Sequence, residues 1–332
     1  MRTHLTLLLA LTGLIGCSSD ELIALPPPPA QPPCQESVLL AISPELSATS
    51  NLLLVVDRSG SMNTDSRWEE MQSAVKTITR ELEDSVAFGL MLFPAAGLNT
   101  CGPGRVGVEP SLHNANAIAR ELEQWSPLGG TPTALSLQQA GDYLLRTFDT
   151  GPHYLLLATD GWPGCNGNLN PQTCPCPPEA VCGIISDNCL DDVRTASTVL
   201  QLREQGVYTF VVGIPGTEEI TDLLDAMAVA GGTAVNGHHY PVTNEAELIG
   251  ALRSITADLI PCVYDLDAPV MTPQWVEVRI DGNTIPRDST RQNGWALLDA
   301  DRLALFGQAC ETMRDGSAHQ LEAYIDCDPE RP

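Results

Sequence analysis

Basic side chains are scarce in this sequence. It has 17 Lys and Arg residues against 42 Asp and Glu residues, and its formal net charge is −25 at pH 7. Proteins that bind nucleic acid or anionic membrane surfaces need Lys and Arg to neutralise the phosphate groups. The composition therefore argues against nucleic acid as a partner, and it favours the attraction of cations.

Common catalytic motifs are missing as well. The sequence has no GxSxG nucleophile elbow, no HExxH zinc helix and no GxxxxGK(S/T) phosphate loop. We therefore expect a protein that is not an enzyme. Metal-assisted hydrolysis stays as the weaker alternative, because a bound metal ion can still activate water.

Long apolar segments are missing too, apart from a short one at the amino terminus. Residues 1–16 contain one arginine, an interrupted apolar run and a small residue before Cys17. This composition is typical of an export signal, and the run is too short to span a bilayer. The proline-rich residues that follow Cys17, up to residue 33, predict an extended spacer.

Cys17 itself is a candidate for lipid attachment. The segment Leu14–Cys17 resembles a bacterial lipobox, which implies acylation of Cys17 and cleavage before it. An ordinary export signal with an incidental cysteine is the alternative. We expect a mature protein that is tethered to the bacterial envelope by this lipid rather than spanning a membrane, because several acyl chains anchor a protein stably. Ser18 resembles an outer-membrane sorting residue, so the outer membrane is the expected location.

Oxygen-bearing side chains follow a continuous apolar run after this spacer. Residues 52–56 are continuously apolar, as in a strand buried on both faces of a parallel sheet. Asp57, Ser59 and Ser61 come directly after that strand. One carboxylate and two hydroxyls are hard oxygen ligands, which suit Mg²⁺, Mn²⁺ or Ca²⁺ better than zinc or copper.

These residues resemble the first part of the metal-ion-dependent adhesion site of von Willebrand factor A (vWA) domains. Residues 129–133, Gly-Gly-Thr-Pro-Thr, are similar to the threonine loop of that family, and Thr159-Asp160-Gly161 after the apolar residues 153–158 is similar to its aspartate loop. Ordinary turn formation by Ser, Gly, Asp and Thr is the alternative explanation. The resemblance covers roughly residues 50–260. It implies one divalent cation, Mg²⁺ in the first place and Mn²⁺ or Ca²⁺ otherwise, held by Asp57, Ser59, Ser61, Thr131 and Asp160.

Apolar strands alternate with amphipathic helical segments along most of the chain. The pattern predicts strands over residues 52–56, 86–93, 153–158 and 207–214, and helices over 67–83, 113–125, 132–147, 190–206, 218–230 and 245–259. Thr131 would cap the third helix, and residues 37–42 would form an edge strand. This alternation predicts an α/β fold with a doubly wound, mostly parallel sheet, of the kind that the vWA resemblance implies. We assign this domain to residues 34–260, with a cysteine-rich insertion over 162–190.

The pattern changes after Pro261. Alternating apolar and polar residues lead into an Asp281-Gly282 turn, a strong signal for a β-hairpin, and residues 295–306 alternate around a second turn. Residues 261–332 are therefore predicted to form a small β-rich appendage. No separate activity is expected for it.

Eleven cysteines are present, and removing the lipidated Cys17 leaves an even ten, which suits an oxidising compartment. We expect three disulfides within an insertion group and two within a terminal group, with the individual pairings open. Zinc binding by Cys174 and Cys176 is the alternative. The insertion group is Cys101, Cys165, Cys174, Cys176, Cys182 and Cys189, and the terminal group is Cys34, Cys262, Cys310 and Cys327.

Together these features predict an envelope-anchored, cation-dependent adhesion protein that captures a carboxylate of a protein or glycan ligand. Its Asp, Ser and Thr cluster includes no base with an expected pKa near neutrality, which weighs against hydrolysis. A non-adhesive scaffold subunit of an envelope complex is the other alternative, in which the metal only stiffens the loops.

Overall fold

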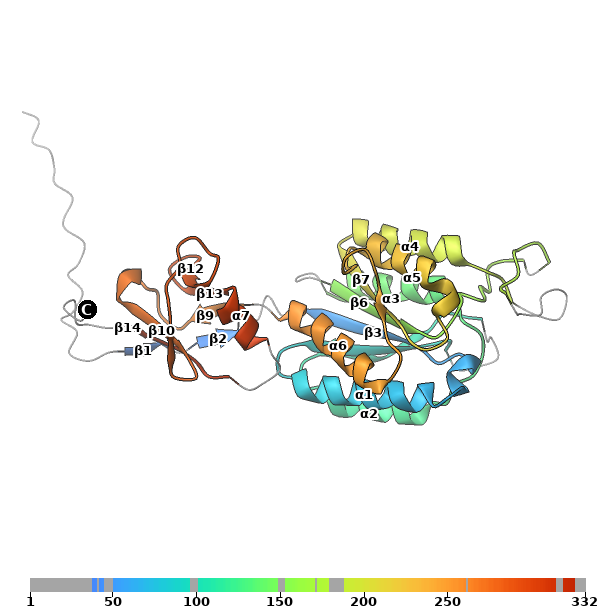
Figure 1. Cartoon of the computed structure of the whole chain (residues 1–332), viewed down its shortest axis with the longest axis horizontal. Helices are drawn as coiled ribbons and strands as arrows, with labels where there is room; N and C mark the ends of the chain where they lie inside the picture. The colour runs from blue at the N-terminus through green and yellow to red at the C-terminus, as the bar shows by residue number, and fades with distance from the viewer. Residues whose placement is uncertain are drawn as a thin grey trace, which may run out of the picture.

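The computed structural model describes residues 38–40, 42–44, 50–95, 101–148, 153–170, 172–178, 188–260, 262–314 and 319–325. They form a larger lobe with a six-stranded sheet and a smaller lobe with two four-stranded sheets (Figure 1). The predictions for the export signal, for Cys17 and for Cys34, Cys182 and Cys327 lie outside the described residues. Among the described residues, no helix has both the length and the apolar character needed to cross a membrane.

The sheet of the larger lobe has the strand order β5-β4-β3-β6-β7-β8. Five of its strands run parallel, namely β3 (Asn51–Asp57), β4 (Ala87–Phe93), β6 (His153–Thr159), β7 (Val207–Gly213) and β8 (Tyr240–Pro241). The sixth, β5 (Arg105–Ser111), is antiparallel to β4 at the edge. This mostly parallel sheet confirms the predicted fold class.

Helices cover both faces of this sheet, and for that reason its central strands are apolar throughout. Alternate residues of β3 point to opposite faces. Leu52, Leu54 and Val56 belong to the core shared with α1 (Arg67–Leu82), α2 (Ala115–Gln124) and α6 (Glu245–Leu259). Leu53 and Val55 belong to the core shared with α3 (Thr133–Thr147), α4 (Asp192–Glu204) and α5 (Thr221–Gly231). Figure 1 shows the two helical layers on either side of the sheet.

Several local details differ from the sequence prediction. Strands β5 and β8 were not predicted, because β5 alternates at an exposed edge instead of forming an apolar run and β8 has only two residues. Helix α3 begins at Thr133 with Pro132 as its cap, so the prediction of Thr131 as the cap was wrong; Pro132 has a ψ of 62°, which is not helical. Short 3-10 turns lie at Gly60–Asn63, Glu218–Ile220 and Pro273–Trp275. Asn244 caps α6, since its side chain accepts a hydrogen bond from the Glu247 backbone N–H at 3.0 Å.

The smaller lobe confirms the predicted β-rich region. Its elements are β9 (Val263–Leu266), β10 (Val276–Ile280), β11 (Asn283–Ile285), β12 (Gly294–Leu297), β13 (Arg302–Phe306), α7 (Gln308–Met313) and β14 (Leu321–Ile325). Asp281 and Gly282 join β10 to β11 with φ values of 50° and 77°. Two successive positive φ angles are the geometry that the tight hairpin turn needs. Trp295, Val278 and Leu303 lie in the centre of a separate apolar core.

The first two strands of the chain belong to this smaller lobe. Strand β1 (Val38–Leu40) pairs with β14, and β2 (Ile42–Pro44) pairs with β9. The prediction of an edge strand of the main sheet over residues 37–42 was therefore wrong, because an apolar strand pattern does not say which distant strand will be its neighbour. Along the chain, the six-stranded domain therefore lies between β2 and β9, which both belong to the smaller lobe.

Candidate functional site

Two aspartates lie at the carboxyl ends of neighbouring strands in the larger lobe. Asp57 is the last residue of β3, Asp160 follows the last residue of β6, and the two strands pair directly. From β3 the chain proceeds to β4 on one side, and it later returns to β6 on the other side. The two carboxylates therefore flank the point where the strand order reverses, which is where doubly wound sheets bind their ligands.

Hydrogen bonds connect four of the five predicted ligands. Oδ1 of Asp57 accepts a bond from the Ser59 backbone N–H at 2.7 Å. Ser61 Oγ lies 3.0 Å from Ser59 Oγ and donates to Asp160 Oδ1 at 2.8 Å. The structure thus brings Asp57, Ser59, Ser61 and Asp160 into one network, although 99 positions separate Ser61 from Asp160.

Thr159 is a member of this network that the sequence analysis missed. Its hydroxyl donates to Asp57 Oδ2 at 2.7 Å. The sequence analysis quoted it as the first residue of the aspartate loop but gave it no role, and in the structure it ends strand β6. Its position directly before Asp160 was the available signal.

The fifth predicted ligand, Thr131, lies in a loop that packs against the first loop. The Gly60 N–H donates to the Gly129 carbonyl at 3.0 Å, and the Leu128 N–H donates to the Arg58 carbonyl at 2.8 Å. Thr131 is half-buried, and within the described residues its hydroxyl forms no hydrogen bond with the other four. The threonine loop is therefore adjacent to the site, while the Thr131 side chain stands outside the network.

Arg67, at the start of α1, provides the site with a cation from the chain itself. Its Nη1 lies 2.9 Å from Asp160 Oδ2, and the two side chains are 15% and 0% exposed. Its Nε is buried and has no hydrogen-bond partner among the described residues. The sequence analysis did not select Arg67, since an arginine in the first turn of a helix gives no sign of a partner 93 positions away.

The charges in this site are only partly balanced. Burial and, after it, the charge of Asp160 raise the pKa of Asp57 to about 7, although hydrogen bonds from Ser59 and Thr159 act in the opposite direction. A pKa near neutrality was not expected for this cluster. Asp57 is fully buried, and both of its oxygens accept hydrogen bonds.

The residues present fit a small divalent cation. Two adjacent buried carboxylates repel each other, and three hydroxyls nearby offer further hard oxygen atoms. The described residues form no group of three or more His, Cys, Asp or Glu side chains suited to a metal. A cation here would therefore depend on hydroxyl and water oxygens for most of its coordination, as Mg²⁺ commonly does.

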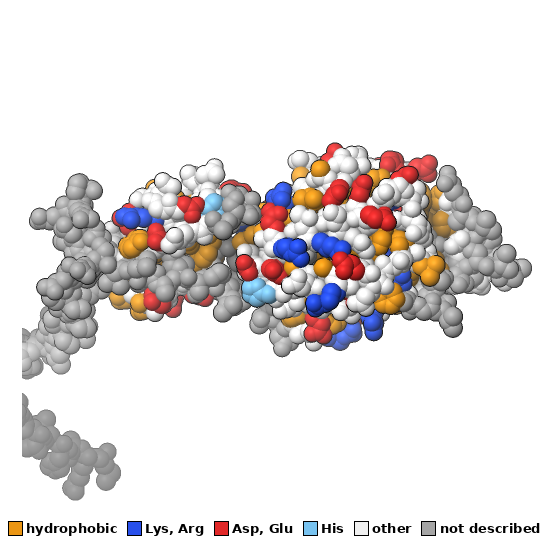
Figure 2. Space-filling model, turned by 90° about the horizontal axis from the view of Figure 1, so that it is seen from below, with side chains coloured by type: hydrophobic (Ala, Val, Ile, Leu, Met, Phe, Trp, Pro, Cys, Tyr) orange, Lys and Arg blue, Asp and Glu red, His pale blue; other side chains and the backbone are white. Residues whose placement is uncertain are grey.

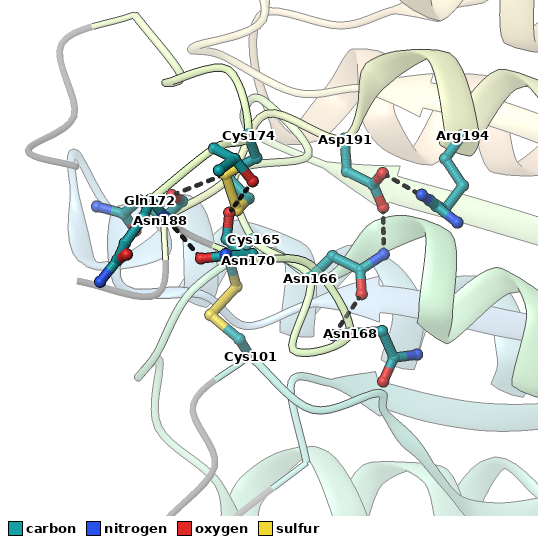
Figure 3. Close-up of a disulfide and its surroundings, with 12 residues drawn as sticks. Cys101, Cys165, Asn166, Asn168, Asn170, Gln172, Cys174, Asn188, Asp191 and Arg194 are labelled. Carbon is teal, nitrogen blue, oxygen red and sulfur yellow. Dashed lines mark hydrogen bonds and ion pairs between the residues drawn. A yellow bond between two sulfur atoms is a disulfide. The ribbon is translucent and has the colours of Figure 1, made fainter. Parts of the chain in front are cut away.

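A disulfide-linked rim borders the threonine loop. Cys101 and Cys165 join the segment before β5 to the insertion, and Cys174 and Cys189 close a second loop (Figure 3). A Cβ on Gly130 would collide with Cys165 Sγ, so the first disulfide packs directly on the threonine loop. Figure 3 also shows Asp191, which accepts hydrogen bonds from Asn166 and Arg194 and so connects the insertion to the start of α4.

The described disulfides all join cysteines within one of the two expected groups. Besides the two in the insertion, Cys262 pairs with Cys310 in the smaller lobe. Cys174 and Cys176 are both disulfide-bonded, so neither is a thiolate available to zinc. The zinc alternative is therefore wrong.

A second charged surface lies on the helical face formed by α1, α2 and α6. Figure 2 shows Lys and Arg side chains gathered there, with acidic side chains between them. Lys76 pairs with Glu123, and Arg253 pairs with Glu81, each at 2.8 Å. Exposed pairs of this kind contribute little to stability or recognition, so this face is not a candidate site for an anion.

Comparisons with known proteins agree with this architecture. A family model for the von Willebrand factor type A domain matches residues 52–162. Uncharacterized protein YfbK from Escherichia coli (strain K12) is 28% identical over 243 residues, which are 70% of this chain and 36% of YfbK.

Among solved structures, the open conformation of the pilus adhesin SpaC from Lactobacillus rhamnosus GG aligns with a TM-score of 0.51 and 15% identity, over 84% of this chain and 38% of SpaC. The vWF domain of the type V pili tip protein Mfa5 from Porphyromonas gingivalis aligns with a TM-score of 0.49 and 12% identity, over 64% of this chain and 95% of that domain. This chain thus spans little more than a third of the length of YfbK and SpaC.

The matched residues 52–162 include β3, β4, β5 and β6 and all five predicted ligands. The strand order, the two helical layers and the loop motifs agree with the family match. This chain therefore contains a von Willebrand factor type A domain.

Proposed function

We propose that this protein is a cation-dependent adhesion protein of the bacterial envelope. One divalent ion, Mg²⁺ in the first place and Mn²⁺ or Ca²⁺ otherwise, would be held directly or through water by Asp57, Ser59, Ser61, Thr131 and Asp160. The observation that carries the proposal is the meeting of two buried carboxylates and their serine partners where the strand order reverses. The pilus adhesin SpaC, which shares the fold, makes adhesion a reasonable role for such a domain.

The chain's own groups explain why such a site would bind an anionic ligand. Two carboxylates formally balance the charge of a divalent ion, but Arg67 already compensates part of the Asp160 charge, so a bound ion would keep some positive charge. When bound, an ion of this kind offers a coordination position to which a ligand carboxylate can bind in place of water. Protein side chains and acidic glycans both present such groups.

The insertion would select among ligands by shape. Its disulfides hold a loop region with little apolar core of its own beside the threonine loop. It also borders a cleft of about 720 Å³, which includes Leu169 and Leu190 from the insertion and Val193 from α4. Val193 is 79% exposed, so this cleft offers apolar contact surface beside the insertion.

Attachment to the envelope is a separate part of the proposal. Lipid on Cys17, followed by the proline-rich spacer, would hold the domain away from the outer membrane. A Cys17→Ser protein should leave the membrane fraction after export. Its retention there would contradict the anchor without affecting the adhesion site.

A scaffold function is the second candidate, and one observation favours it. The ion pair between Arg67 and Asp160 satisfies one carboxylate without a metal, so the loops can be held by the chain alone. In this case the protein would organise an envelope complex, and its loops would not capture a ligand through an ion.

Thermal unfolding and partner capture separate the two candidates. Thermal unfolding of the full chain would be measured in chelator and again with millimolar Mg²⁺, Mn²⁺ or Ca²⁺. Under the same conditions, the immobilised protein would be used to capture partners from envelope extracts. Stabilisation by an ion together with capture that chelator abolishes would support adhesion. No stabilisation by any of the three ions would refute the ion site. Stabilisation with capture unchanged by chelator and by Thr131→Ala would favour the scaffold.

A further inference from the structure

A cluster of aromatic side chains lines a cleft at the other end of the same sheet. Tyr154 and Tyr208 are the second residues of β6 and β7 and lie opposite each other in register, at the amino ends of these strands. Phe210 and Tyr240 extend the cluster toward β8. The cleft has a volume of about 350 Å³, and residues 232–235 and the end of α6 form its other walls.

The rings form a curved wall rather than a flat stack. The ring centroids of Tyr154 and Tyr208 are 5.8 Å apart at 32°, and those of Tyr154 and Phe210 are 6.0 Å apart at 35°. Phe210 and Tyr240 are 6.5 Å apart at 56°. Tilted pairs at these separations are the usual packing of aromatic rings, and all four rings line the same cleft, so a group seated in it would contact them.

This corner of the sheet is uncovered, although β7 is an inner strand. Tyr208 is 38% exposed, whereas Phe210, two residues further along the same strand, is 6% exposed. Helix α6 packs on this face and ends at Leu259, beside the cleft. A sequence with only 5 Phe, 6 Tyr and 5 Trp residues thus leaves an exposed tyrosine within an aromatic group of four.

The electrostatic character of the cleft is negative. Asp258 lines it, is exposed and forms no ion pair with any described residue. Asp258 lines the cleft together with Tyr154 and Tyr240; burial raises the pKa values of these two hydroxyls, and the charge of Asp258 raises them further. The last turn of α6 contains no basic residue, so the partial negative charge of the helix end is not offset there.

We propose that this cleft binds an organic cation, either a quaternary ammonium group or the side chain of an arginine or lysine presented by another protein. Aromatic ring faces, an unpaired carboxylate and a helix carboxyl terminus all favour positive charge. No Lys or Arg lines the cleft, so the cation must come from outside it. The chain uses the same contact elsewhere, since Arg279 lies 5.0 Å from the centroid of the Tyr324 ring.

The inference does not depend on the proposed ion site, because the two sites lie at opposite ends of the sheet. A neutral sugar is the competing occupant, as aromatic rings also stack on sugars. The wall offers few hydrogen-bonding side chains to recognise sugar hydroxyls, namely those of Thr233, Asp258 and the tyrosines, and so the cation is the better match.

Two pairs of probes with nearly the same shape and different charge test the inference on the full chain. Choline would be compared with 3,3-dimethylbutan-1-ol, and N-acetylarginine amide with N-acetylcitrulline amide, by ligand-observed NMR and calorimetry in the presence of chelator. We expect the charged member of at least one pair to bind about tenfold more tightly than its neutral partner. The pair that shows the preference identifies the ammonium or the guanidinium as the source of the cation.

Variants then assign the binding to this cleft. Tyr208→Leu keeps an apolar side chain and removes the ring, and Asp258→Asn removes the charge; each should weaken binding of the cation about fivefold or more. Trp275→Leu, at an exposed aromatic of the smaller lobe, and Asp222→Asn, at an exposed acid of α5, are the matched controls and should bind as the wild type does.

Equal binding of charged and neutral probes would overturn the inference, and so would the absence of binding at millimolar concentrations. Binding of methyl glucoside in place of both cations would also overturn it and would assign the cleft to a sugar. Unfolding curves of each variant would show whether a loss of binding reflects a loss of the fold. If Tyr208→Leu does not fold, the binding of the cation by folded Asp258→Asn decides the result.

Discussion

The two ends of the six-stranded sheet have different chemistry on neighbouring strands. At the carboxyl ends, Asp57 and Asp160 are 0% and 2% exposed and are held by short hydrogen bonds. At the amino ends, Tyr154 and Tyr208 face an open cleft. In our proposals both ends attract positive charge, but one suits a small hard ion and the other suits a large polarisable one. The difference arises because loops rich in hydroxyl groups leave the carboxyl ends of β3 and β6, whereas α6 finishes beside the amino ends.

The largest effect is expected from removing a carboxylate at the carboxyl end. Asp160→Ala should abolish the whole stabilisation by divalent ions, which is about 3 kcal/mol when the ion exceeds its Kd by a hundredfold. The cleft at the amino end should bind its cation unchanged. Thermal unfolding with and without Mg²⁺ measures the first effect, and Asp222→Asn provides a control for loss of an acid elsewhere. An ion-induced rise in Tm that survives Asp160→Ala would show that the ion binds at another site.

A close contact beside the ion site should give an effect of similar size on folding. Gly130→Ala should lower the free energy of unfolding by about 2–3 kcal/mol, because its Cβ would collide with Cys165 Sγ and a packed region accommodates added volume poorly. Gly161→Ala is the matched control, since a Cβ there meets no atom within 4 Å. Denaturant unfolding of both variants would compare them, and equal stabilities would contradict the packing of the disulfide on the threonine loop.

The loop that leads to Tyr240 provides a pH test beside the carboxyl end of β7. Asp225 accepts hydrogen bonds from both His238 and His239. Burial alone would raise the pKa of Asp225, but hydrogen bonds from His239 and His238 outweigh it and lower this pKa to about 2. A depressed pKa means that the carboxylate stabilises the fold above its ordinary pKa, and that this stability is lost as the pH falls toward 2.

Asp225→Asn should therefore lower the free energy of unfolding by about 2 kcal/mol near neutral pH. The difference between wild type and variant should shrink as the pH falls from about 4 to about 2. Urea unfolding at a series of pH values measures this difference. A difference that stays constant down to pH 2 would show that the carboxylate is not held as the hydrogen bonds indicate.

The smallest effect is expected from substitution of Arg67. This substitution changes the charge at the carboxyl end of the sheet without removing a proposed ion ligand. Arg67→Gln should raise the affinity for Mn²⁺ about tenfold, because a positive charge next to Asp160 opposes a second cation. In chelator the same variant should unfold more easily, since Asp160 loses its partner. Arg67→Lys keeps the charge and serves as the control. Calorimetric titration that finds weaker ion binding by Arg67→Gln would show that Arg67 supports the ion site instead of competing with it.

Features that depend on neighbouring residues could be predicted from the sequence. The buried strands β3, β4, β6 and β7 are apolar runs, and the helices that cover them repeat their apolar residues at helical spacing. The turn at Asp281-Gly282 depends on two adjacent residues. The aspartates and serines of the candidate site were found in the same way, because each follows an apolar strand and carboxyl ends of parallel strands meet at one edge.

Features that depend on distant partners were decided only by the tertiary structure. Residues 37–42 were predicted to form an edge strand of the main sheet, yet Val38–Leu40 pair with β14 and Ile42–Pro44 pair with β9, because any exposed strand edge can satisfy their backbone hydrogen bonds. The pairing of Arg67 with Asp160 and the meeting of Tyr154, Tyr208 and Tyr240 depend on the strand order in the same way. Sequence alone determined which residues form strands, helices and turns. Which of those elements became neighbours, and therefore which charges and rings face each other, was set by packing between segments far apart in the chain.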